Sequence, residues 1–155
     1  MEKLLYNNKL YVCHEYLLEK DFESAVIEQA PHIFGENSIY IDIKKQIGES
    51  IITIPDGYLI DFSLEVEPRL HIIENELSSH DPYKHIGSQL LKFAISYKAS
   101  GRKIKEFLLD ALMKDESMRE RVEAGFLRAG YRNIDAFLES CLLYTSPSPR
   151  DSTSS

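Results

Sequence analysis

Three acidic side chains within two short apolar segments are the residues of this chain best placed to do chemistry. Asp56 follows Pro55 and opens the apolar run 57–62, whereas Glu74 and Glu76 lie inside the run 70–77. A carboxylate inside an apolar strand is costly to bury unless something compensates its charge, and a divalent cation is a common compensation. The pattern therefore indicates a candidate metal site.

The spacing of these acids predicts that they share one face of a hairpin. Residues i and i+2 of a strand point to the same side, so Glu74 and Glu76 project together, roughly 7 Å apart along the strand. Segment 64–68 is short and is typical of a hairpin connection. With that turn centred near Val66, Asp56 lies across from Glu76, and all three carboxylates converge.

The backbone carbonyl of Asn75, between the two glutamates, is a further candidate ligand. An all-oxygen set of this kind suits Mg²⁺ or Mn²⁺ and not zinc. A plainer interpretation stays open, in which Asp56 is a turn residue and the glutamates lie on the solvated face of an edge strand. Leu70 and Ile72 share the face of the glutamates, so that face is not simply polar.

Composition narrows the class of protein. A chain of 155 residues is expected to form one domain, and it has no stretch of 18 apolar residues. Its formal net charge of −7 does not favour general affinity for nucleic acids. Cys13 and Cys141 form neither a disulfide framework nor a zinc motif, so we expect a cytoplasmic protein with no membrane segment.

The last fifteen residues differ in composition from the rest. Residues 141–155 are rich in Ser, Thr and Pro, which do not pack a core, and 141–151 resembles one reading frame of a common sequencing adapter. We therefore expect a single domain over 1–140 and a non-native or disordered tail over 141–155. On this interpretation the natural protein continues beyond Ser140; an ordinary disordered tail is the alternative.

Apolar spacing and turn residues predict the elements that must position the acids. Helical spacing that includes Leu17 and Leu18 predicts a helix over 11–30, stopped by Pro31. Gln89 falls on or beside the apolar stripe of a later helix and needs a polar partner there. The other expected elements are a strand at 39–43, a strand or its lead-in at 50–54, and helices at 82–101, 104–112, 118–130 and from 133 onward.

The order helix, strand, strand, strand, helix, with Pro55-Asp56 and Glu74-Asn75-Glu76 on neighbouring strands, resembles the PD-(D/E)xK nuclease superfamily. The resemblance covers about residues 16–97. It implies an α/β (α+β) fold with a restriction-endonuclease-like core and a mixed or antiparallel sheet, followed by extra helices. The family's further strand is not evident between 101 and 140, which fits a C-terminally truncated domain.

The resemblance also implies an activity and roles for named residues. It implies a Mg²⁺-dependent nuclease, most simply a DNA endonuclease, in which Asp56, Glu74 and the Asn75 carbonyl hold the metal. Glu23 matches the acid of the family's first helix, with Glu28 a weaker candidate. Gln89 resembles a helix glutamine found in several branches of the superfamily.

One departure leaves catalysis open. Glu76 stands where the family usually has a lysine, so it would act as a base or ligate a second cation, and Lys92 is a candidate for the displaced charge. The alternatives are a catalytically inactive module that binds nucleic acid or a protein partner, including a homodimer, and an unrelated α/β interaction domain. The basic residues that could contact phosphates, or form plain helix surface, are Lys84, Lys92, Lys98, Arg102, Lys103 and Lys105.

Overall fold

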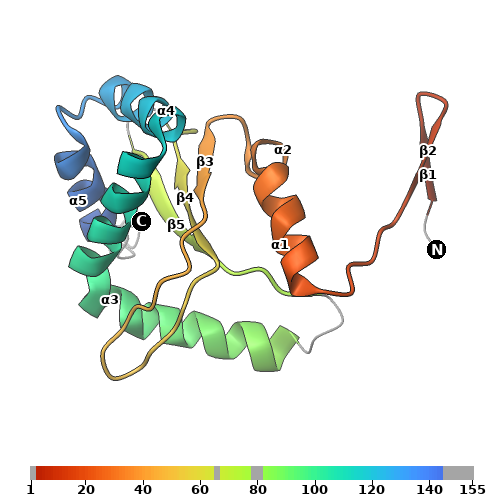
Figure 1. Ribbon diagram of the computed structural model, residues 1–155, viewed down its shortest axis with the longest axis horizontal. Helices are drawn as coiled ribbons and strands as arrows, with labels where there is room; N and C mark the ends of the chain where they lie inside the picture. The colour runs from red at the N-terminus through yellow and green to blue at the C-terminus, as the bar shows by residue number, and fades with distance from the viewer. Residues whose placement is uncertain (1–2, 65–66, 78–81, 145–155) are drawn as a thin grey trace, which may run out of the picture.

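The computed structural model describes residues 3–64, 67–77 and 82–144, which form a mixed α+β architecture (Figure 1). Two small antiparallel sheets and five helices make up this part of the chain. In chain order the elements are β1 (Lys3–Tyr6), β2 (Lys9–Val12), α1 (Glu19–Glu28), α2 (Ala30–Phe34), β3 (Ser38–Ile41), β4 (Gly57–Asp61), β5 (Arg69–Ile73), α3 (Pro82–Lys114), α4 (Glu116–Arg128) and α5 (Ile134–Tyr144).

The central sheet consists of β3, β4 and β5 in that order, and both neighbouring pairs are antiparallel. Its strands are rich in Ile, Leu and Tyr, which favour extended backbone and pack well on a pleated surface. Ile39 pairs with Ile60, which in turn pairs with Leu70, so three apolar side chains line up across the sheet. The expected sequence of three strands between helices is therefore present.

Helices cover both faces of this sheet (Figure 1). Alternate strand residues such as Tyr58 and Ile60 pack into the larger core with α3, α4 and α5, where Leu108 and Phe137 are fully buried. The intervening residues form a smaller core with α1 and α2, made of Val26, Ala30, Tyr40 and Leu59. The strict alternation fixes which side of the sheet each strand residue faces.

The helix that follows β5 is longer than expected. α3 runs without interruption from Pro82 to Lys114, whereas the sequence predicted that Gly101 would divide it into two helices. The helix bends near its middle (Figure 1), and Ser100-Gly101 is the kind of Gly/Ser pair at which helices bend. Ile104 and Phe93, on either side of this pair, are both buried in the larger core. Burial on both sides outweighs the roughly 1 kcal/mol penalty of one helical glycine.

The N-terminal segment also differs from the prediction. Residues 3–12 form the β1–β2 hairpin, whose last two residues fall within the helix expected at 11–30. Asn7 and Asn8 take the positive φ values of 49° and 60° that a two-residue hairpin turn requires. Leu17 and Leu18, assigned to the buried stripe of that helix, are exposed. The helix begins only at Glu19, and a second short helix follows it, with Pro31 in its first turn.

The C-terminal helices lie close to their predicted positions: α4 covers Glu116–Arg128 where 118–130 was expected, and α5 begins at Ile134. The carboxylate of Asp115 accepts a 2.9 Å hydrogen bond from the backbone N–H of Met118, which caps α4. α5 continues to Tyr144, so the predicted domain boundary after Ser140 lies inside a helix. Cys141, which the sequence placed outside the fold, is buried in the larger core. Residues 145–155 of the expected tail lie outside the described part of the chain.

The connection between β3 and β4 runs along α3. The strand expected at 50–54 is not formed; the segment makes only one bridge, between Ile47 and Thr53. Ser96 donates a 2.7 Å hydrogen bond to the Ile51 carbonyl, and Ser100 accepts one of 2.8 Å from the Gly48 N–H. Two buried hydroxyls of α3 therefore fix the path of this connection. None of the helices in the described residues is long and apolar enough to cross a membrane.

Candidate metal and catalytic site

The two strongest sequence candidates meet at one edge of the central sheet. Asp56 directly precedes β4 and Glu74 directly follows β5, and the terminal pair of the ladder is Gly57 with Ile73. The Asp56 N–H continues the ladder with a 3.1 Å hydrogen bond to the Ile73 carbonyl. Asp56 is therefore beside Glu74.

The expected pairing of Asp56 with Glu76 was wrong by two residues. In the observed register, the midpoint of the β4–β5 connection falls one residue before Val66, the predicted turn centre. Val66 lies outside the described residues. A shift of two residues in the partner strand preserves the face to which each side chain points. Glu74 therefore still lies on the α3 side of the sheet, on the face of Leu70 and Ile72, as predicted.

Asp56 is held by the backbone of the neighbouring strand. Its Oδ2 accepts a 2.7 Å hydrogen bond from the Asn75 N–H. The buried Asn75 side chain points to the opposite face, where its amide donates to the Tyr40 hydroxyl at 3.4 Å. Burial and the nearby carboxylate of Glu23 raise the pKa of Asp56, while the Asn75 N–H opposes this increase. Asn75 thus supports the site through its N–H group; its carbonyl as a metal ligand remains a prediction.

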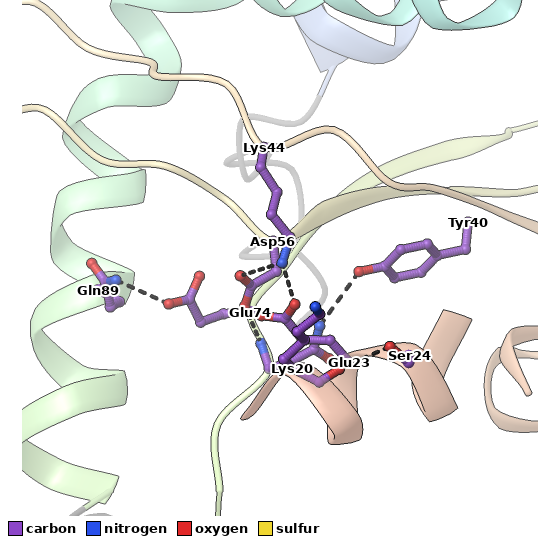
Figure 2. Close-up of polar contacts among 9 residues, drawn as sticks. Lys20, Glu23, Ser24, Tyr40, Lys44, Asp56, Glu74 and Gln89 are labelled. Carbon is purple, nitrogen blue, oxygen red and sulfur yellow. Dashed lines mark hydrogen bonds and ion pairs between the residues drawn. The ribbon is translucent and has the colours of Figure 1, made fainter. Parts of the chain in front are cut away.

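Glu74 projects toward α3, where Gln89 binds it (Figure 2). The Gln89 side-chain amide donates a 2.9 Å hydrogen bond to Glu74 Oε1, and the Thr53 hydroxyl donates to the Gln89 carbonyl at 3.4 Å. The partner that the sequence required for Gln89 is therefore Glu74. The other carboxylate oxygen of Glu74 is buried and has no hydrogen-bond partner among the described residues. Burial, reinforced by the charge of Asp56, raises the pKa of Glu74 to about 7.

A lysine that the sequence reasoning did not single out enters the site. The ammonium of Lys44 binds the Glu23 carboxylate of α1 and lies 4.0 Å from Oδ1 of Asp56 (Figure 2). The hydrogen bond to Glu23 raises the pKa of Lys44, so it stays protonated. A register argument could have found it: Ile41 pairs with Tyr58, so the residues after β3 lie beside those before β4.

The charges and burial at this edge fit a cation. Two neighbouring carboxylates have raised pKa values, because burial disfavours their charged forms and a second carboxylate lies near each: Glu23 near Asp56, and Asp56 near Glu74. The buried oxygen of Glu74 that lacks a partner in the described residues could accept such an ion. Glu76 adds negative charge near Glu74. No group of three His, Cys, Asp or Glu side chains in the described part of the chain is arranged to hold a metal, so a bound ion would also need backbone, water or substrate oxygens.

The remaining candidates lie outside this cluster. Glu28 and Lys92 are exposed. Lys105, part of the expected phosphate-binding stretch, instead forms an ion pair of 2.8 Å with Asp135 of α5. Of the same stretch, Lys98, Arg102 and Lys103 are exposed on α3, and Lys84 lies outside the residues whose side chains are described.

No protein-family model, curated protein or solved structure matches this chain, so its function has to be argued from the site itself.

Proposed function

We propose that this chain is a divalent-metal-dependent phosphodiesterase that acts on DNA, with a restriction-endonuclease-like core. The observation that carries the proposal is the meeting of Asp56 and Glu74 at the ends of two adjacent strands, with one oxygen of Glu74 buried and unpartnered among the described residues. Glu23 and Gln89 contact the same cluster from the helices on either side. Four of the residues expected from the sequence pattern thus support one common site.

In this proposal Asp56 and Glu74 hold Mg²⁺ or Mn²⁺, together with the carbonyl of Asn75. When bound, the cation would stabilise the negative charge that develops on a phosphodiester during in-line attack by water. Gln89 keeps Glu74 in one orientation through its 2.9 Å hydrogen bond. The Asn75 N–H does the same for Asp56. Both carboxylates are thereby preorganised before any ligand arrives.

Two further residues would share the remaining chemistry. Glu76, two residues after Glu74, would accept the proton of the attacking water. It cannot supply the positive charge of the lysine that usually occupies its motif position. Lys44 would supply that charge from the loop after β3, because its ammonium already lies 4.0 Å from Asp56. A cation there can stabilise a phosphate oxygen held next to the metal.

A second function is favoured by the same lysine. Lys44 compensates the charges of Glu23 and Asp56 within the chain, and the described residues contain no trio of metal-ligating side chains. A domain that has kept the fold but lost catalysis would show both properties. The alternative is therefore a non-catalytic module that binds nucleic acid or a protein through this fold.

Metal binding and cleavage measured on the same variants separate the two functions. The enzyme should bind Mn²⁺, followed by electron paramagnetic resonance, and should nick supercoiled plasmid only when Mg²⁺ or Mn²⁺ is present. Asp56→Asn and Glu74→Gln should abolish both properties, whereas Glu28→Gln, an exposed acid near the end of α1, should retain both. Metal-independent plasmid binding without cleavage would favour the module. Cleavage that survives Asp56→Asn would contradict the proposed site.

A further inference from the structure

The β1–β2 hairpin stands away from the rest of the molecule (Figure 1). Every residue of both strands is exposed, including Leu5 at 70% and Leu10 at 61%. A two-stranded hairpin without a covering layer is marginally stable in water at best. Exposed apolar side chains on both of its faces indicate that it is covered by another surface in solution.

The register of the hairpin separates its two faces. Leu5 pairs with Leu10, and Val12 on the same side pairs with Lys3, so one face is aliphatic with a lysine at its end. The other face carries Tyr11 paired with Leu4 and Tyr6 paired with Lys9, so each face has one lysine. The segment 3–12 contains two lysines and no acidic residue, although the chain as a whole has a formal charge of −7. The partner of this basic, aliphatic hairpin should therefore be apolar and acidic.

The chain itself carries such a surface immediately after the hairpin. Segment 15–28 contains five acidic residues and one lysine, and Asp21 and Glu28 are exposed on α1. Exposed aliphatic side chains lie among and beside these acids: Leu17, which is 88% exposed, Leu18, Ile27 and Ile33. The acidic charge and the exposed aliphatic side chains of this α1–α2 surface thus complement the basic charge and the aliphatic face of the hairpin.

We propose that the hairpin of one chain docks on the α1–α2 surface of a second copy, and that the second copy returns the same contact. Because one chain carries both complementary surfaces, a dimer with two-fold symmetry forms the same contact twice. Two-fold symmetry is the commonest arrangement of homodimers. In Figure 1 the hairpin lies apart from its own α1, so it is free to contact another molecule. The proposal does not depend on nuclease activity.

Charge exchange between two variants tests this arrangement on the full chain. The wild type should sediment as a dimer in analytical ultracentrifugation. The first double variant, Lys3→Glu with Lys9→Glu, has an acidic hairpin. The second, Asp21→Lys with Glu28→Lys, has a basic α1. Each double variant alone should dimerise at least about tenfold more weakly than the wild type. Mixed together, they should form a one-to-one dimer, since each hairpin then meets a helix of opposite charge.

A second pair of variants tests the apolar contact. Leu5→Glu with Leu10→Glu should weaken the dimer at least about tenfold, whereas Leu127→Glu, an exposed leucine on α4, should not. Circular dichroism should show the wild-type fold in both. A wild type that stays monomeric at high micromolar concentration would overturn the proposal, because the hairpin would then fold onto its own chain or remain free. A dimer that none of the hairpin or helix variants affects would overturn it as well.

Discussion

Gln89 donates a hydrogen bond to one carboxylate oxygen of Glu74 and leaves the other oxygen buried, with no partner in the described part of the chain. This half-satisfied carboxylate is the most informative feature of the candidate site. Burial strongly disfavours its charged form, and only one neutral donor opposes that effect. A cation or a proton would complete its coordination.

Stability in the absence of metal should fall as the pH rises. The pKa of Glu74 is about 7 in the folded chain and near 4.5 without the fold, so the folded state binds more protons between these values. The free energy of unfolding should therefore decrease from pH 5 to pH 8, by on the order of 2 kcal/mol. Urea unfolding at several pH values measures this, and Glu74→Gln should remove most of the slope. A slope that is unchanged in Glu74→Gln would place the titrating group elsewhere.

Removal of the glutamine should shift the titration of Glu74 upward. The hydrogen bond from Gln89 lowers the pKa of Glu74, so Gln89→Ala should raise it above about 7. If the metal binds Glu74, the affinity for Mn²⁺ at neutral pH should then fall by about tenfold or more. Carbon-detected NMR of the carboxyl group measures the pKa directly. Lys92→Ala, an exposed change on the same helix, should alter neither quantity.

Lys44 should affect metal binding and cleavage in opposite directions. Loss of an ammonium 4.0 Å from Asp56 removes a competing positive charge, so Lys44→Ala should bind Mn²⁺ several-fold more tightly. The same change should lower cleavage by about a hundredfold if the lysine stabilises the reacting phosphate. Lys45→Ala is the matched control, because its ammonium binds Asp110 on α3 at 3.2 Å. Equal effects of the two variants would argue against a role for Lys44.

The two thiols should react at very different rates. Cys13 is exposed, whereas Cys141 is packed in the larger core and burial raises its pKa to about 12. A thiol reagent should modify one cysteine rapidly in the native protein and the second only after unfolding. In Cys13→Ser, the fast reaction should disappear. A rapid reaction of Cys141 in that variant would mean that the fold ends before this residue.

The hydroxyl of Tyr58 offers a test of the core. It is fully buried and has no hydrogen-bond partner among the described residues, while the ring packs with Ile41 and Ile72. Because an unpaired buried hydroxyl costs free energy, Tyr58→Phe should leave stability unchanged or increase it by up to about 1 kcal/mol. Thermal unfolding checks this. A loss of more than about 1 kcal/mol would indicate a polar partner for the hydroxyl.

The side-chain alternation of strands explains why the site could be predicted despite a wrong register. The predicted turn placed Asp56 opposite Glu76, but a shift by an even number of residues leaves the side-chain alternation unchanged, so Asp56 still meets Glu74 at the ends of β4 and β5. Gln89 could be predicted because a polar residue beside an apolar helical stripe needs a partner. Lys44 was missed because the register of β3 with β4, which brings the residues after β3 beside those before β4, was not assigned from the sequence.

The errors in the fold have equally local causes. The apolar residues before α1 fit helical spacing, yet Asn7 and Asn8 readily take the left-handed backbone of a hairpin turn, and that conformation decides the structure. Gly101 is a common helix terminator, but the burial of Phe93 and Ile104 on both sides of it keeps the helix continuous. The turn preference of two asparagines thus determined the N-terminal hairpin, and tertiary packing determined the continuity of α3.

The connection between β3 and β4 supplies both Lys44 and Asp56, and it is fastened to α3 by Ser96 and Ser100 at two points. The conformational entropy of this connection is therefore lost when the chain folds and not when a ligand binds. The amide protons of this loop should exchange with deuterium only slowly, at a rate close to that of the core of α3. Any variant that loosens those two serines should thus weaken ligand affinity while every acidic group remains in place.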